Sequence, residues 1–232
     1  MTSLTIHDHP SPNFGVRRGG VRPDMVVLHY TAMASAHEAC ARLCAPEFEV
    51  SAHYLIDETG SIYRLVDENY RAWHAGAGQW GDVTDVNSHS IGIELSNTGT
   101  TPFAAAQMNA LEALLADILA RHVIVPERVI GHSDMAPSRK IDPGARFDWR
   151  RLARQGLSVW PEVRCVSEVC QASFDAALDA FGYAPCQAPD ARLRAFRDRF
   201  RGCYDGPLDG YDVAMAQNLA ARFPVDRRDV NT

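Results

Sequence analysis

No part of this 232-residue chain approaches the roughly 18 consecutive apolar residues that a membrane-spanning helix needs. Basic residues are also too few for a protein built to bind a phosphate backbone, since 23 Lys and Arg stand against 29 Asp and Glu. Residues 1–20 are polar and contain no apolar core of a secretory signal. We therefore expect neither nucleic acid nor a membrane span. We also expect a cytoplasmic location, or a periplasmic or envelope-associated one if a leader was removed.

Cysteine is too sparse for a small scaffold held together by disulfides. The chain has 6 cysteines and no Cys-x-x-Cys pair; Cys40 and Cys44 lie four apart in a helical pattern, and the others fall in the last third. The even number permits disulfides, but the low density favours free thiols. A structural zinc site made of four cysteines is not expected, because such sites are usually built from closely spaced pairs.

The apolar pattern predicts an α/β domain. Hydrophobic residues make up 46% of the chain, enough to bury a core. Strand-like runs occur at residues 25–30, 52–57, 61–66, 90–95 and 129–130, and helical patterns occur at residues 35–44 and 102–122. Residues 71–87 have little periodicity and are expected to form a loop. Strands that alternate with helices predict a mixed central β-sheet flanked by helices.

Three further amphipathic segments follow, at residues 169–181, 191–200 and 213–223. Stretches rich in glycine and proline separate them, which is typical of short helices joined by turns. A unit of about 65 residues can just hold its own core. We therefore divide the chain into an α/β domain at residues 1–160 and a small three-helix domain at residues 168–232.

Two histidines and an aspartate are candidate metal ligands. His29 closes an apolar strand, His132 directly follows a short strand, and Asp142 lies in a loop before Pro143. Two imidazoles and a carboxylate suit zinc and leave one tetrahedral position open for water or substrate. Spacing alone does not bring them together, however. The alternative is that His29 is a core histidine and Asp142 caps a turn.

A carboxylate and a lysine add candidate acid–base chemistry. Alternation places Glu94 on the strand face opposite to Ile91 and Ile93. A mostly buried carboxylate can have a pKa raised toward neutrality, as a general base needs, although a salt bridge at a strand edge is the alternative. Lys140, two residues before Asp142, would share its side in an extended segment and could stabilise an oxyanion. Its alternative is a solvated surface lysine.

Six segments occur in the order typical of one enzyme family. They are VLHYT at 27–31, SAHYLI at 51–56, RAWHAG at 71–76, NSHSIGIEL at 87–95, GHSD at 131–134 and RKIDPG at 139–144. Together they resemble the zinc-dependent N-acetylmuramoyl-L-alanine amidases of the type 2 amidase family. The likeness is to its AmpD and AmiD branch, and the family is related to the peptidoglycan recognition proteins. The helical tail resembles, more weakly, a peptidoglycan-binding-like domain.

The resemblance implies a role for each candidate residue. His29, His132 and Asp142 would bind one Zn²⁺ per chain. Glu94 would be the general base, and Lys140 would polarise the scissile carbonyl. Three further residues, His74, Trp73 and Asn87, would bind substrate in the groove.

The resemblance also implies an activity. The expected reaction is hydrolysis of the amide bond between N-acetylmuramic acid, or its 1,6-anhydro form, and L-alanine. Its substrates would be peptidoglycan or muropeptides, in bacterial cell-wall turnover and recycling. The alternative is a non-catalytic module that binds muropeptides or peptidoglycan. We expect a monomer whose partners are peptidoglycan fragments.

Overall fold

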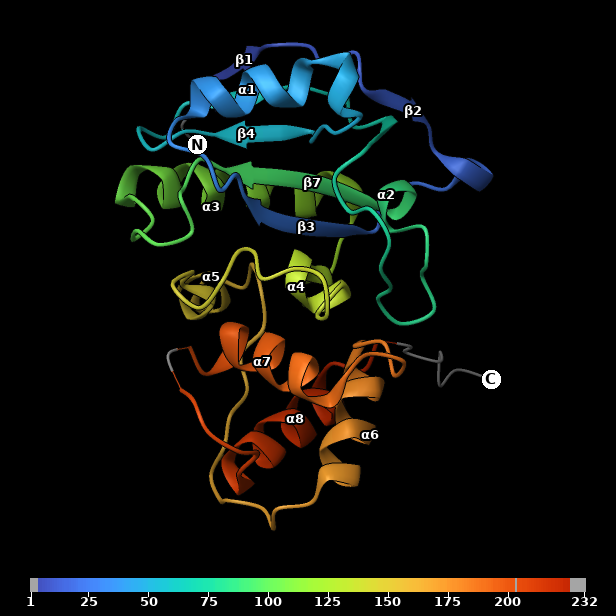
Figure 1. Cartoon of the computed structure of the whole chain (residues 1–232), viewed down its shortest axis with the longest axis vertical. Coiled ribbons are helices and arrows are strands. Elements are labelled where there is room, and N and C mark those ends of the chain that lie inside the picture. Colours follow the sequence, from blue (N-terminus) through green and yellow to red (C-terminus); the bar gives the residue numbers. More distant parts are fainter. Residues whose placement is uncertain (1–3, 203, 226–232) are drawn as a thin grey trace.

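A mixed β-sheet forms the centre of the computed structural model, which describes residues 4–202 and 204–225 (Figure 1). In the described residues the sheet has six strands in the order β1 (Ile6–Asp8), β5 (Ile62–Arg64), β4 (Tyr54–Ile56), β7 (Ser90–Leu95), β3 (Met25–Tyr30) and β8 (Val129–Gly131). Strands β4 and β5 are antiparallel, and the other neighbouring pairs are parallel. The expected fold class, a mixed sheet flanked by helices, is confirmed.

The two faces of the sheet pack against different helices. On one face, Leu28 and Ile93 belong to a buried cluster that includes residues of α3 (Ala105–His122) and α5 (Trp149–Arg154). On the other face, Leu55 packs with residues of α1 (Ala36–Cys44). Successive side chains of a strand point to opposite faces, so this second face is also the one that His29 and Glu94 share.

Helix α1 follows its sequence signals. The side chain of Ser35 caps the helix by accepting a hydrogen bond from the backbone N–H of Glu38, at 3.2 Å. After Cys44 the chain turns, and Pro46 opens the 3₁₀ helix η2 (Pro46–Phe48). A helix that begins after a serine and ends before a proline is what the sequence predicts.

Short elements account for most differences from the sequence-based expectation. Strands β2 (Phe14–Val16) and β6 (Tyr70–Ala72) pair with each other, and helix α2 (Val86–His89) ends the stretch expected to be a loop. The other elements without a sequence prediction are β1, α4 (His132–Met135), α5, η1 (Arg18–Gly20), η2 and η3 (Pro126–Arg128). None exceeds six residues, so their sequences are too short to show a helical or strand period.

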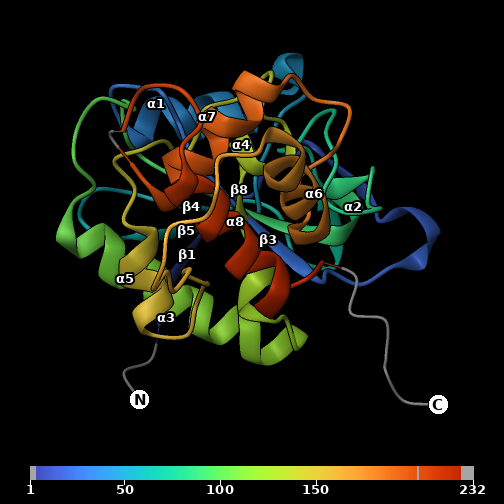
Figure 2. The same ribbon diagram turned by 90° about the horizontal axis from the view of Figure 1, so that it is seen from below.

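The C-terminal part contains the three expected helices, α6 (Gln171–Phe181), α7 (Pro189–Phe200) and α8 (Gly210–Arg222). Figures 1 and 2 show them as one group, and in Figure 1 helices α4 and α5 lie between this group and the sheet. Their apolar residues belong to the same buried cluster as Met25 and Val27 of β3. The core of the helices is therefore continuous with the core on one face of the sheet, and the division near residues 160–168 stays a prediction.

The structure bears on two further expectations, free cysteine thiols and the absence of a membrane-spanning helix, for the residues that it describes. Cys40, Cys44, Cys165, Cys170 and Cys186 are free thiols, as the low cysteine density favours, and Cys203 lies outside the described residues. Within residues 4–202 and 204–225, no helix combines the length and the apolar character needed to cross a membrane.

Candidate metal centre and active site

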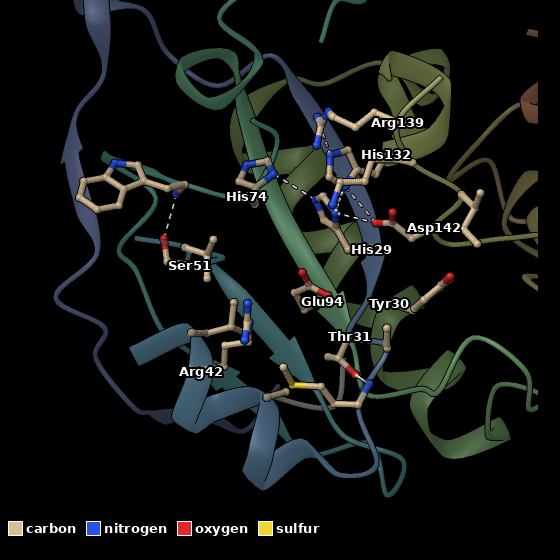
Figure 3. Close-up of a pocket in the computed structure, with 18 residues that line it drawn as sticks. His29, Tyr30, Thr31, Arg42, Ser51, His74, Glu94, His132, Arg139 and Asp142 are labelled. Atoms are coloured by element: carbon tan, nitrogen blue, oxygen red, sulfur yellow. Dashed lines mark hydrogen bonds and ion pairs between the residues drawn. The ribbon is translucent and has the colours of Figure 1, made fainter. Parts of the chain in front are cut away.

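His29, His132 and Asp142 converge at one edge of the sheet (Figure 3). His29 lies near the end of β3, and His132 is the first residue of α4, directly after β8. Because β3 and β8 are parallel neighbours, their carboxyl ends meet at the same edge. The Nδ1 atoms of the two histidines are 2.9 Å apart, and each lies 3.0 Å from Oδ2 of Asp142. Three side chains that are distant in the sequence thus form one buried triangle.

The second nitrogen of each histidine has its own partner. Nε2 of His132 donates to the carbonyl oxygen of Ala75, at 2.8 Å, which leaves Nδ1 without a proton in the neutral ring. Nε2 of His29 lies 3.0 Å from Nδ1 of His74. Hydrogen bonds of this kind fix the tautomer and orientation of metal-binding histidines.

The direction of the His29–His74 hydrogen bond follows from the hydrogen bonds that Ser90 makes. The Ser90 hydroxyl donates to the carbonyl oxygen of Val86 at 2.6 Å, since a carbonyl can only accept. Ser90 Oγ therefore accepts from Nε2 of His74, at 3.2 Å. Nδ1 of His74 is then unprotonated and accepts from Nε2 of His29. The lone pair of His29 Nδ1 is left facing His132 and Asp142.

Burial favours the neutral form of the His29 and His74 rings. It lowers the pKa of His29 to about 4 and, together with the charges of nearby histidines, lowers that of His74 well below its ordinary value. Burial alone would raise the pKa of Asp142, but the contacts of this carboxylate with His132 and His29 outweigh burial, so its pKa is lowered. Two neutral imidazoles and a carboxylate are the protonation states in which these side chains bind metal.

The triangle fits a metal ion. The three ligand atoms all lie within 4.8 Å of one another and form the group of His, Cys, Asp or Glu in the described residues that could hold one. Tetrahedral zinc with nitrogen and oxygen ligands at about 2.0–2.1 Å has neighbouring ligand atoms about 3.3 Å apart. The observed separations of 2.9 and 3.0 Å are close to that value. The donor set and its spacing therefore suit zinc.

Glu94 lies beside the triangle. It is paired with His29 in the β3–β7 register, so the two side chains share a face of the sheet. Its Oε2 atom is buried and has no hydrogen-bond partner among the described residues. Burial, together with the negative charge of Asp142, raises the pKa of Glu94 to about 8. A carboxyl group with this pKa can both accept and return a proton near neutral pH.

A cavity of about 380 Å³ opens over the triangle and Glu94. Trp73, His74 and Lys140 line it and also line a neighbouring hollow, so the two together form a longer groove. The positive charge of Lys140 reaches the site electrostatically, because it lowers the pKa of both His29 and Glu94, although burial is the larger influence on each. The expected groove residues are therefore placed around the candidate ligands.

Asn87 supports the groove by binding the backbone of His74 and Ala75. The residue is 6% exposed, and its Oδ1 accepts the backbone N–H groups of His74 (3.0 Å) and Ala75 (2.8 Å). It also lines the hollow beside the main cavity. Asn87 thus fixes the backbone that positions His74 and carries the carbonyl partner of His132.

Several lining or supporting residues have no sequence-based assignment, among them Arg42, Ser51, Ser90 and Arg139. Arg139 follows α4 and donates to the carbonyl oxygens of Ala75 and Ala77, both at 2.6 Å, which ties the two walls of the groove together. Figure 3 draws Arg42 on the α1 side of the cavity. Arg139 is the first residue of the RKIDPG segment, so the sequence contained a signal that could have identified it. Arg42 stands in no motif, and only the packing of α1 places it here.

Comparisons with known proteins agree on one family. A family described as N-acetylmuramoyl-L-alanine amidase matches residues 19–145. The chain is 36% identical to the N-acetylmuramoyl-L-alanine amidase AmiD of Escherichia coli strain K12, over 88% of this chain and 85% of AmiD. It is 33% identical to the 1,6-anhydro-N-acetylmuramyl-L-alanine amidase AmpD of Enterobacter cloacae, over 62% of this chain and 86% of AmpD.

A solved structure extends the likeness to the helical tail. E. coli AmiD in complex with the substrate anhydro-N-acetylmuramic acid-L-Ala-D-gamma-Glu-L-Lys superposes with a TM-score of 0.82 and 35% identity, covering 91% of this chain and 93% of that one. A coverage this high includes residues on both sides of the division near residues 160–168.

Proposed function

This chain belongs to the N-acetylmuramoyl-L-alanine amidase family, and from that premise we propose that its His29, His132 and Asp142 bind one Zn²⁺ for the family's reaction. The reaction is hydrolysis of the amide bond between N-acetylmuramic acid and L-alanine, in peptidoglycan turnover and recycling. The observation that carries the zinc proposal is the triangle of two imidazole nitrogens and a carboxylate oxygen, with sides of 2.9 and 3.0 Å.

The chain's own residues supply the remaining chemistry. When bound, zinc supplies a Lewis acid and lowers the pKa of water, as in other zinc hydrolases. Glu94 would accept the proton of the attacking water and then give it to the leaving amine of L-alanine, since its pKa near 8 permits both. Lys140 would place an ammonium group against the oxygen on which negative charge develops. None of the cysteines is needed as a nucleophile.

The groove residues would hold the substrate. Trp73 and His74 line the groove, and Asn87 fixes the backbone between them and the ligands. We infer that muropeptides with N-acetylmuramic acid or its 1,6-anhydro form both fit this class of site, because the relatives include AmiD and AmpD. Action as a monomer and a cytoplasmic location are further proposals, and fractionation of cells that express the native gene would test the location.

The direct test is release of free peptide. Full-length protein loaded with zinc is incubated with N-acetylmuramoyl-L-Ala-D-γ-Glu-L-Lys and, separately, with its 1,6-anhydro form, and the products are identified by mass spectrometry. We expect a peptide with a new amino terminus at L-alanine, loss of activity with a chelator, and recovery when zinc is added. Binding of the muropeptide without any release would instead support the alternative of a non-catalytic binding module.

A further inference from the structure

The C-terminal helices contact the segment that carries the candidate active site. Helix α7 packs against both α4 and α5, and Figure 1 shows it directly below them. The first residue of α4 is His132. Two sets of hydrogen bonds cross between the helices and this segment.

The first set holds α4 through a buried carboxylate. Asp134 is 0% exposed, and its Oδ2 accepts the backbone N–H of Gly131 (2.7 Å) and a guanidinium N–H of Arg199 (2.8 Å). Its Oδ1 accepts the hydroxyl of Tyr183 at 2.5 Å. Arg199 and Tyr183 belong to the C-terminal part of the chain. The turn that presents His132 is therefore anchored from both parts of the molecule.

The second set lies closer to the reacting groups. The Nη2 group of Arg194, on α7, donates to the carbonyl oxygen of Pro137 and to that of Lys140, the latter at 3.1 Å. On its other side, the same segment is held by the carbonyl oxygen of Ala136, which accepts the N–H groups of Arg139 and Lys140 at 2.9 Å. Arg194 thus binds two carbonyl oxygens of the turn that connects α4 to the candidate ligand Asp142.

The contact matters because the segment is short and carries two functional groups. Only Ile141 separates Lys140 from Asp142, so a shift of the backbone at Lys140 would move both its ammonium group and the carboxylate. A displacement of a reacting group by about 1 Å can reduce the reaction rate by about a hundredfold. A guanidinium that fixes two carbonyls limits such shifts.

We propose that Arg194 is a positioning residue for the active site, which it serves by holding the turn at residues 137–140 from helix α7. The C-terminal helices would then form part of the catalytic machinery through this contact, in addition to any role in binding glycan. The proposal rests on the proposed function through the role given to Lys140.

The test compares Arg194→Ala with Arg194→Lys in the full-length zinc-loaded protein. For Arg194→Ala we expect kcat to fall about tenfold with KM changed less than about twofold, because the loss affects positioning and not substrate binding. The midpoint of thermal unfolding should change by less than about 2 °C, since Arg194 is exposed. Arg194→Lys should recover part of kcat, because an ammonium group can still reach one carbonyl.

Hydrogen exchange supplies a readout that does not depend on activity. In metal-free protein, Arg194→Ala should speed amide exchange in peptides covering residues 136–142 and leave peptides from α1 and α3 unchanged. The matched control is Arg222→Ala, which removes the arginine at the end of α8 that pairs with Glu162. Arg192→Ala controls for lost stability, because Arg192 pairs with Asp175 and Asp179 inside the tail.

Each outcome decides the proposal. Faster exchange at residues 136–142 with a lower kcat, in Arg194→Ala alone, supports it. Wild-type exchange in Arg194→Ala overturns it, as does a loss of kcat that Arg192→Ala reproduces in proportion to its lower unfolding midpoint. A wild-type protein with no amidase activity would count against the proposed function, and the exchange experiment would still decide whether Arg194 holds the turn.

Discussion

At the scale of single residues, the hydrogen bonds behind the metal ligands decide which nitrogen faces the ion. His74 accepts from His29 only because Ser90, bonded to a carbonyl, requires the other nitrogen of His74 to carry the proton. His74 therefore lines the groove and also orients a ligand. Its ring fits over β7 because residue 92 is a glycine: a Cβ there would overlap the ring of His74.

The substitution Gly92→Ala tests this arrangement without altering any ligand. We expect the new methyl group to displace His74 and free the His29 ring, and metal affinity to fall about 10–100-fold, the usual range for losing such a support. Competition with a chromophoric zinc chelator measures the change. Gly15→Ala is the control, since a Cβ there meets nothing closer than 3.8 Å. Equal affinities for Gly92→Ala and wild type would contradict the orienting role.

Glu94 is the residue whose loss should separate chemistry from metal binding. Glu94→Gln keeps the size of the side chain but cannot accept a proton, so kcat should fall by about a hundredfold or more. Zinc content should stay at one per chain, because Glu94 is not one of the three converging ligands. Steady-state kinetics and elemental analysis check the two parts, and retained activity would remove Glu94 from the mechanism.

At the scale of elements, a half-buried carboxylate joins strand β4 to the end of helix α3. Glu68 accepts from the hydroxyl of Tyr54 on β4 (2.8 Å) and pairs with Arg121 (2.9 Å) and His122 (2.7 Å) at the end of α3. Burial raises its pKa, but the hydrogen bonds from these three side chains outweigh burial and lower it from 4.5 to about 2.

The sign of the resulting pH dependence follows from that shift. A carboxyl with a lower pKa in the folded state stabilises the fold above its unfolded-state pKa and loses this effect as pH falls from 4.5 toward 2. Glu68→Gln should therefore lower the free energy of unfolding by roughly 1–2 kcal/mol at neutral pH, after allowing for solvent screening. The difference from wild type should shrink below about pH 4.5.

Urea unfolding at a series of pH values measures this difference. Glu58→Gln is the control, because it changes an exposed carboxylate in the turn between β4 and β5. A difference between Glu68→Gln and wild type that stays constant from neutral pH to about pH 3 would show that Glu68 does not link these elements by its charge.

At the scale of the whole molecule, the C-terminal helices share a buried core with the sheet. Phe181 on α6 is 1% exposed, and its ring centroid lies 5.5 Å from that of Trp80, in the loop after β6. The same ring lies 5.8 Å from Phe200 of α7. The contact of Phe181 with Trp80 joins the two parts of the molecule, and it predicts that they unfold together.

Phe181→Ala tests that coupling. Removing a buried phenylalanine costs about 3–5 kcal/mol, and we expect the whole unfolding transition to move as one. Within each protein, far-ultraviolet circular dichroism and tryptophan fluorescence should report the same unfolding midpoint as each other, and that midpoint should be lower in the variant than in wild type. Val166→Ala, at a residue that is 67% exposed, is the control. Two separate transitions would favour independent domains divided near residues 160–168.

The sequence predicts the long elements and the chemistry of the ligands. Residues 25–30 and 90–95 show strand patterns, residues 102–122 show a helical pattern, and β3, β7 and α3 lie within these bounds. Burial of Ile91 and Ile93 on the face opposite to Glu94 follows from alternation alone. These properties depend on neighbours within a few residues, which is why the sequence by itself determined them.

Only the tertiary structure decided how these residues meet. The convergence of His29, His132 and Asp142, the hydrogen bond that orients His29, and the contact of Arg194 with Lys140 all join residues from separate elements. No local period reports such distances, because they are set by strand order, sheet register and the packing of α7 against α4. The amino-acid types fix what chemistry the site can perform, and the packing of the whole chain fixes whether its parts lie within reach of one another.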